Sequence, residues 1–233
     1  MRKIKFENNK YYHVFNRGAN KANIFFSDED RKRFLWSLRV FNDVDANFIS
    51  VRLKENLGAS LLDLGKDRLV DILCIVLMPN HFHLLLKQVQ NNGISKFMHK
   101  LGTSYTNYVN LKYGHSGILF QGPFKAVEIE SDEQLTHLSR YIHLNPVELV
   151  ESQWKEEGIK DLKNIRSFLR SYKWSSYRVY LGEADPVMRG IIVNNNLIND
   201  LIPADKYQEF IEDWFNKVKM EANSTILGAK LLE

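Results

Sequence analysis

Hydrophobic residues gather in two short runs near the middle of the chain, residues 72–78 and residues 81–86. Pro79 and Asn80 separate the two runs, which are rich in isoleucine, valine and leucine. Short apolar runs broken by Pro-Asn are typical of two adjacent strands rather than of one helix. The pattern therefore predicts a pair of neighbouring strands in the middle of the chain.

The flanking segments alternate between extended and helical patterns. In each helical pattern, a capping residue comes first and apolar residues follow it at helical spacing. Residues 43–68 have no clear period and are interpreted as an inserted loop. In chain order, the predicted elements are a strand over residues 11–16, a helix of about sixteen residues capped by Ser27 or Asp28, the central strand pair, a helix from about Ile94 to Gly114, a strand within residues 118–130, and a helix from Ser131 to Asn145.

This order of elements, β-α-β-β-α-β followed by a helix, is that of a ferredoxin-like sandwich. We expect an α+β fold in which helices pack over one face of an antiparallel sheet. Residues 183–233 differ in charge, with 5 basic against 9 acidic residues, and residues 203–216 have the spacing of an amphipathic helix. The prediction is a domain over residues 1–182 and a helical C-terminal extension over residues 183–233 that docks on it.

Composition narrows the class of protein. A chain of 233 residues that is 44% hydrophobic can bury a real core. Its single cysteine, Cys74, lies in an apolar run, which excludes a disulfide framework and a thiolate metal cluster and favours a cytoplasmic protein. No stretch approaches the ~20 apolar residues that a membrane span requires, so we expect neither export nor membrane insertion.

The net charge of +4 hides an asymmetry between the two halves of the chain. Residues 1–131 contain 19 basic and 12 acidic residues, a net +7, whereas residues 132–233 contain 13 and 16, a net −3. The basic half includes the central strand pair. A cationic surface favours a polyanionic partner, and nucleic acid is the commonest one.

Two histidines lie within the second hydrophobic run. On a strand, His81 and His83 point to the same face, while Phe82 points to the other. Two neutral imidazoles side by side can form half of a divalent-metal site. The same pair could also be two hydrogen-bonded, half-buried histidines, and the residues alone leave both interpretations open.

A second group of polar residues lies at the end of the last predicted helix. Tyr141 and Asn145 are four residues apart, so they share a helix face and lie one turn from each other. A phenol and an amide could therefore meet one target. The residues by themselves favour a simpler interpretation, in which Tyr141 is a packing residue and Asn145 ends the helix before Pro146.

Four segments together resemble one protein family: residues 78–86, 116–125, 141–146 and 174–177. In sequence, order and spacing they are similar to the single-tyrosine HUH transposases, in particular to the branch of REP-associated tyrosine transposases. The resemblance extends over roughly residues 10–182. Four separate matches are far more specific than a lone His-x-His motif.

The resemblance implies a role for each of four residues. His81 and His83 match the family's two metal-binding histidines, Asn145 matches the third ligand, and Tyr141 matches the nucleophile. Members of the family use Mg²⁺ or Mn²⁺ to cut and rejoin single-stranded DNA, commonly beside a hairpin, through a 5′-phosphotyrosine link that leaves a free 3′-hydroxyl. We therefore expect an endonuclease and strand transferase that acts on single-stranded or hairpin DNA as a monomer or homodimer.

Two other functions are compatible with this fold. One is a non-catalytic hairpin-binding regulator derived from a transposase, which the presence of all four matched residues argues against. The other is a replication initiator or relaxase with similar chemistry. Those enzymes usually have larger domains or a third motif histidine, and neither is visible in the sequence.

Basic side chains are predicted to contact DNA phosphates, each contributing little alone. Among the aromatic residues, Tyr105 and Tyr108 could pack inside the protein or stack on bases, and packing is favoured. His13 lies on the first predicted strand, which can neighbour the strand with the metal ligands, so it could form a hydrogen bond to one of those ligands. The predicted DNA contacts are Arg17, Arg31, Arg33, Lys96, Lys100, Lys112 and Lys125.

Overall fold

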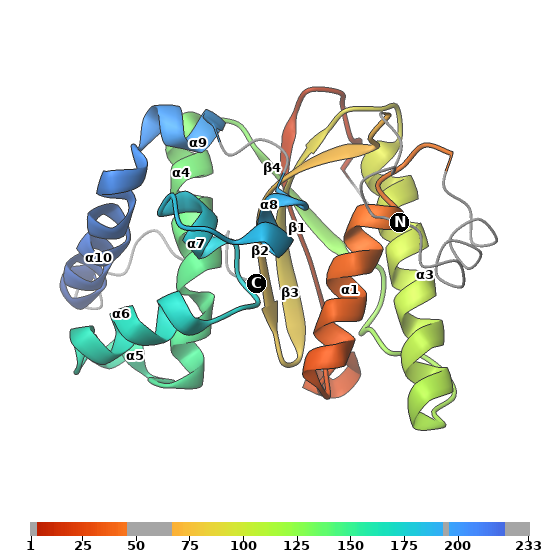
Figure 1. The fold of residues 1–233 in the computed structure, drawn as a ribbon, viewed down its shortest axis with the longest axis horizontal. Helices are drawn as coiled ribbons and strands as arrows, with labels where there is room; N and C mark the ends of the chain where they lie inside the picture. Colours follow the sequence, from red (N-terminus) through yellow and green to blue (C-terminus); the bar gives the residue numbers. More distant parts are fainter. Residues whose placement is uncertain (1–3, 46–66, 193–195, 222–233) are drawn as a thin grey trace.

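The computed structural model describes residues 4–45, 67–192 and 196–221, so most of the predicted inserted loop lies outside the described residues. A four-stranded antiparallel sheet forms the centre of the molecule (Figure 1). Its strands pair in the order β2-β3-β1-β4, which is the order of a ferredoxin-like sheet, and the predicted α+β class is confirmed. The strands are β1 (Tyr11–Arg17), β2 (Val70–Met78), β3 (His81–Gln88) and β4 (Lys125–Ile129).

Two predicted helices cover one face of the sheet (Figure 1). Helix α1 (Asp28–Val40) begins after Ser27, whose hydroxyl accepts a hydrogen bond from the backbone N–H of Asp30. The Asp30 carboxylate accepts one in return from the backbone N–H of Ser27, so two free donors at the helix start are satisfied. Helix α3 (Gly93–Tyr113) ends where Gly114 adopts a left-handed conformation with φ of 64°.

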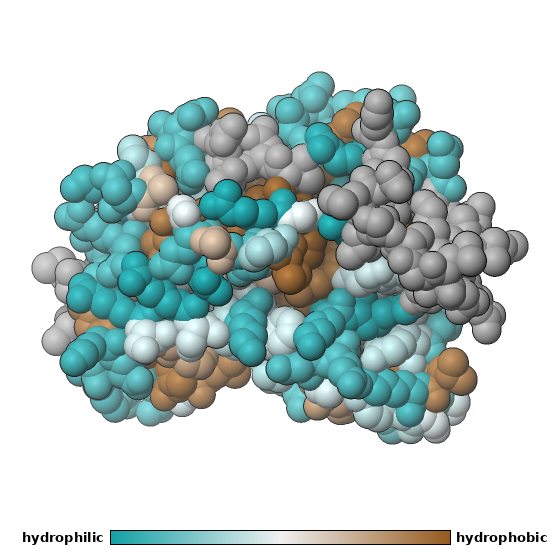
Figure 2. Space-filling model, in the orientation of Figure 1, coloured by the Kyte–Doolittle hydropathy of each residue, from teal (hydrophilic) through white to brown (hydrophobic). Residues whose placement is uncertain are grey.

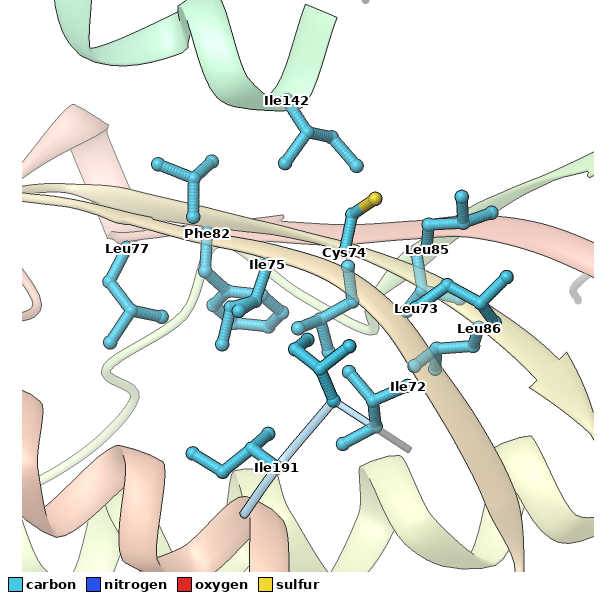
Figure 3. Close-up of a cluster of buried hydrophobic side chains, with 14 of the residues drawn as sticks. Ile72, Leu73, Cys74, Ile75, Leu77, Phe82, Leu85, Leu86, Ile142 and Ile191 are labelled. Carbon is cyan, nitrogen blue, oxygen red and sulfur yellow. The ribbon is translucent and has the colours of Figure 1, made fainter. Parts of the chain in front are cut away.

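The third predicted helix, α4 (Asp132–Leu144), covers the opposite face. Figure 3 shows Ile142 of α4 on one side of the sheet, with Cys74 and Leu85 pointing toward it, and Ile191 on the other side. The sheet is therefore covered on both faces rather than on one. The physical reason lies in β2, whose apolar run over residues 72–78 leaves no polar face to turn toward water.

The outer edge of β2 is also covered, by the segment at residues 174–176. The backbone N–H of Leu77 donates to the carbonyl of Trp174 at 2.9 Å, and the N–H of Ser176 donates to the carbonyl of Ile75 at 3.0 Å. These bonds satisfy backbone groups that an edge strand would otherwise expose. As a result, every residue of β2 is buried.

The C-terminal helices pack against α4 (Figure 1). In α10 (Ala204–Glu221), Tyr207 and Ile211 are fully buried, which confirms the expected docking of this amphipathic helix. The division of the chain after residue 182 stays a prediction. The remaining short elements are η1 (Ala19–Lys21), η3 (Asn145–Leu149), α5 (Trp154–Glu157), α6 (Leu162–Ser171), α7 (Tyr177–Tyr180), α8 (Pro186–Arg189) and α9 (Asn196–Leu201).

Hydrophilic residues predominate on the face of the molecule that Figure 2 shows, and hydrophobic residues form separate patches between them. This distribution agrees with a core that is enclosed between the sheet and the helices on its two faces. Within the described ranges, no helix is both long enough and apolar enough to cross a membrane.

Candidate active site

Strand β3 presents its two histidines to the face of the sheet that α4 covers. Because side chains alternate along a strand, Phe82 points to the other face, where its ring lies 5.0 Å from that of Phe34 on α1. The rings of His81 and His83 are themselves 5.0 Å apart. The predicted orientation of the three consecutive residues is confirmed.

The end of α4 brings a phenol and an amide to these histidines. The ring of Tyr141 lies 5.3 Å from that of His83, and the amide oxygen of Asn145 lies 2.9 Å from Nε2 of His81. One turn of helix separates Tyr141 from Asn145, so both side chains reach the same point of the sheet. The structure thus brings together all four residues predicted for the catalytic centre, although they come from segments about sixty residues apart.

These four residues border a cavity of about 650 Å³. Its lining combines aromatic and amide side chains with a marked excess of positive charge. Such an excess raises the local concentration of phosphate groups and suits a nucleic-acid backbone. The basic residues of the lining are Arg17, Lys21, Lys125 and Lys155, and the acidic residue is Glu148.

Two of these basic residues, Lys21 and Lys155, were missed by the sequence analysis. Lys155 forms an ion pair with Glu148, and its Nζ lies 5.9 Å from the centre of the Tyr141 ring. Its segment has no period that would place it near Tyr141. Lys21 could have been found, because it lies in the short segment that directly follows Arg17, the last residue of β1.

The other predicted DNA contacts lie away from this cavity. Lys112 is bonded to Asp30 at 2.8 Å, Lys100 donates to a backbone carbonyl at 3.1 Å, and Arg31 is paired with Asp28. Arg33 lies 4.6 Å from the centre of the Trp36 ring, and Lys96 is exposed on α3. Their role in DNA binding stays a prediction.

Of the tyrosines of α3, Tyr105 packs inside the protein, and the half-buried Tyr108 and Tyr113 pack against the core. The hydroxyl of Tyr105, which is fully buried, donates to the carbonyl of Ile24 at 2.8 Å. The hydroxyls of Tyr108 and Tyr113 donate to the two carboxylate oxygens of Asp30 at 2.9 and 2.8 Å. The interpretation of Tyr105 and Tyr108 as packing residues is confirmed.

Burial sets the protonation state of the candidate catalytic residues. It lowers the pKa of His81 and lowers that of His83 well below its ordinary value, so both imidazoles are neutral at pH 7 and each keeps a lone pair. Burial raises the pKa of Tyr141 to about 12. The hydrogen bond from Asn145 lowers it and the charge of Glu148 raises it further, so the phenol keeps its proton at neutral pH.

The donor atoms at this point fit a small divalent cation. Within the described part of the chain, no three histidine, cysteine or acidic side chains cluster, so a third ligand has to be of another type. The amide oxygen of Asn145 is such a ligand, and its distance of 2.9 Å from His81 Nε2 is suitable. Two adjacent ligands of an octahedral ion at about 2.1 Å lie about 3 Å apart. Imidazole nitrogen and amide oxygen together suit Mg²⁺ or Mn²⁺.

A comparison with protein families supports the resemblance found in the sequence. The family model described as "Transposase IS200 like" matches residues 8–145, which is more than half of the chain. The chain therefore belongs to the family of IS200-like transposases. The matched region contains all four residues of the candidate catalytic centre, with Asn145 at its end.

Among solved structures, that of a REP-associated tyrosine transposase bound to a REP hairpin is similar to this chain. The match covers 82% of this chain and 87% of that chain, with 14% sequence identity and a TM-score of 0.49. No curated protein matches the chain.

Proposed function

We propose that this transposase-family protein is a metal-dependent endonuclease and strand transferase that acts on single-stranded DNA beside hairpins. The observation that carries the proposal is the convergence of Tyr141, His81, His83 and Asn145 on one cavity with four basic side chains. A nucleophile, a candidate cation site and phosphate-binding charge are the parts that phosphodiester transfer requires.

Tyr141 is the nucleophile of the proposed reaction. Its phenolic oxygen forms a bond to the scissile phosphorus while the bond from phosphorus to the upstream 3′ oxygen breaks. The phenol loses its proton and the leaving oxygen gains one, so the products are a 5′-phosphotyrosine and a free 3′-hydroxyl. Because the new phosphodiester keeps the energy of the old one, an incoming 3′-hydroxyl can reverse the step and join a different strand.

The high pKa of Tyr141 is the obstacle that the site has to overcome, because a neutral phenol is a poor nucleophile. His81, His83 and Asn145 would hold a Mg²⁺ or Mn²⁺ ion, which supplies charge stabilisation to the phosphate oxygens when bound. The cationic side chain of Lys155 lies over the Tyr141 ring and opposes the charge of Glu148. Asn145 also donates to Tyr141 and so aids loss of the phenolic proton.

A second cavity gives the DNA strand a route beyond the catalytic centre. It has a volume of about 500 Å³ and shares Asn16, Gly122 and Pro123 with the first cavity. Its lining includes the half-buried aromatic rings of Phe120 and Phe124, which can pack against bases. We propose that an unpaired segment crosses both cavities, with its phosphates on the basic side chains of the first.

The experiment that tests this function asks which tyrosine carries DNA. Purified protein is incubated with Mg²⁺ and a labelled hairpin oligonucleotide that has an unpaired flank. We expect an adduct that survives denaturation and an upstream strand whose 3′ end a polymerase can extend. Tyr141→Phe removes one oxygen and should bind the oligonucleotide normally without forming the adduct, whereas Tyr105→Phe and Tyr108→Phe should still form it.

Two results would contradict the proposal in different ways. An adduct formed by Tyr141→Phe would mean that the nucleophile is another residue. Tight hairpin binding by the wild-type protein without any adduct in Mg²⁺ or Mn²⁺ would instead favour the non-catalytic regulator.

A further inference from the structure

The side-chain amide of Asn80 connects the β2–β3 turn to His81. Its Nδ2 donates to the backbone carbonyl of Lys21 at 3.2 Å, and a carbonyl can only accept. The amide oxygen of Asn80 therefore faces His81, whose Nδ1 lies 2.6 Å away. A contact between this oxygen and Nδ1 is a hydrogen bond only when Nδ1 carries the proton. In the neutral ring, Nε2 then keeps the lone pair. The amide oxygen of Asn145, 2.9 Å from Nε2, competes for the same proton, and the shorter contact to Asn80 favours Nδ1.

His83 has a partner of a different kind. Its Nδ1 lies 2.8 Å from Nε2 of His13 on the neighbouring strand β1, and both side chains are buried. The contact requires one proton between the two nitrogens. When His83 supplies that proton from Nδ1, its Nε2 is the nitrogen with the lone pair, and neutral His13 carries its own proton on Nδ1. When His13 supplies the proton instead, the proton of His83 is on Nε2.

The second ring nitrogen of His13 makes an imidazole costly at this position. Nδ1 of His13 is buried and has no hydrogen-bond partner within the described residues. Buried polar atoms are nearly always paired, because leaving one unpaired costs free energy. An apolar side chain at residue 13 would avoid that cost, but it would leave Nδ1 of His83 without the partner that it has at 2.8 Å.

We propose that Asn80 and His13 are positioning residues, which hold the ring protons of His81 and His83 on Nδ1 and so leave both Nε2 atoms free for one metal ion. The proposal rests on the proposed function for the identity of the metal ligands. Histidines that bind metals usually give their other N–H to an oxygen acceptor. In this protein an amide oxygen from a turn serves one ring, and an imidazole nitrogen from a neighbouring strand serves the other.

The first test measures the ring protons directly, in the metal-free full-length protein. Nitrogen-15 NMR of the histidine rings distinguishes the Nδ1–H from the Nε2–H tautomer. We expect His81 to be in the Nδ1–H form in the wild type and in Asn80→Asp, which keeps the oxygen acceptor. Asn80→Ser keeps a turn-forming residue but is too short to reach the ring, and it should populate the Nε2–H form. Finding wild-type His81 in the Nε2–H form would overturn the proposal.

The second test measures the affinity for Mn²⁺ by isothermal titration calorimetry without DNA. In His13→Gln, the amide reaches the place of Nε2, whereas in His13→Asn it reaches only the place of Nδ1. We expect His13→Asn and Asn80→Ser to weaken Mn²⁺ binding 10- to 100-fold, while His13→Gln and Asn80→Asp stay within about threefold of the wild type. Hairpin binding in EDTA checks that each variant is folded.

His83→Ala separates failure of this inference from failure of the proposed function. If His83→Ala binds Mn²⁺ as tightly as the wild type, the proposed metal site is wrong. If His83→Ala loses Mn²⁺ but His13→Asn and Asn80→Ser bind it like the wild type, the site stands and the positioning role is wrong. If Gln and Asn at residue 13 weaken binding equally, His13 acts by packing and not as an acceptor.

Discussion

The buried His143 and the pair formed by half-buried His81 and buried His83 are two groups of histidines that differ in what their second ring nitrogen faces. His143 of α4 has its Nδ1 2.7 Å from the hydroxyl of Tyr207 and its Nε2 2.7 Å from the hydroxyl of Ser176. Hydroxyls can donate or accept, so this ring is satisfied in either tautomer. His81 and His83 each have Nδ1 paired inside the protein and border a basic cavity.

Burial and pKa do not distinguish the two groups. Burial lowers the pKa of His143 to about 3, and it also lowers the pKa of His81 and His83. All of these rings are therefore neutral at pH 7, as a metal ligand and a core histidine both have to be. What separates a candidate ligand from a structural residue is the partner of its second nitrogen.

The two groups also act on the same helix from opposite sides. His143 connects α4 to Tyr207 of α10 and to Ser176, which in turn binds the backbone of Ile75 in β2. Tyr141, two residues earlier, faces the cavity. The structural histidine thus helps to fix the helix that carries the proposed nucleophile.

The strongest test of the difference between the two groups is to remove one imidazole ring from each of them. His83→Ala should lower Mg²⁺-dependent cleavage by more than about 100-fold, because a ligand of the metal is lost. His143→Leu should bind Mn²⁺ within about threefold of the wild type, since both of its nitrogens are used inside the protein. Cleavage of a hairpin oligonucleotide and calorimetry measure the two effects. Equal loss of Mn²⁺ affinity in both variants would contradict the distinction.

A smaller effect is expected in the pH dependence of stability. The pKa of His143 is about 3 in the folded protein and 6.5 in the unfolded chain, so its contribution is fully present above pH 6.5 and is lost as the pH falls toward 3. This loss amounts to ~2 kcal/mol between pH 7 and pH 5. His143→Leu should be less stable at pH 7, because the hydroxyls of Tyr207 and Ser176 each lose one hydrogen-bond partner, but it should lose ~2 kcal/mol less on acidification.

Urea denaturation of both proteins at the two pH values measures this difference. Because the other buried histidines are present in both proteins, the comparison isolates His143. The same change in the free energy of unfolding for wild type and His143→Leu would show that folding does not lower the pKa of His143.

The smallest expected effect is the loss of a single phosphate contact from a basic side chain of the cavity that the candidate catalytic residues border. Arg17→Gln should weaken hairpin binding several-fold and reduce the slope of log affinity against log salt by about 1, because one phosphate contact is lost. Lys206→Gln, which changes an exposed lysine of α10, should leave both quantities unchanged. Fluorescence anisotropy across a salt series in EDTA measures both variants. A matching decrease in slope for Lys206→Gln would place DNA on both sides of α4.

The elements that the sequence predicted correctly are those with strong local signals. Ser27 and Ser131 begin their helices as caps, Gly114 ends α3, and Pro79 with Asn80 forms the turn between β2 and β3. The cover of the second sheet face by α4 was not predicted, because it depends on packing between distant segments. For the same reason Lys155 was missed, since its own segment gives no signal of its place beside Tyr141.

The sequence by itself determined the period of each element and therefore which side chains share a face. The alternation of a strand places His81 with His83, and the turn of a helix places Tyr141 with Asn145. Only the tertiary structure decided that the two pairs meet, and which ring nitrogens have partners. The physical reason is that a hydrogen bond depends on the position of its partner atom. The partner of His83 is His13, seventy residues earlier in the chain. A pattern of neighbouring residues cannot predict a contact over such a separation.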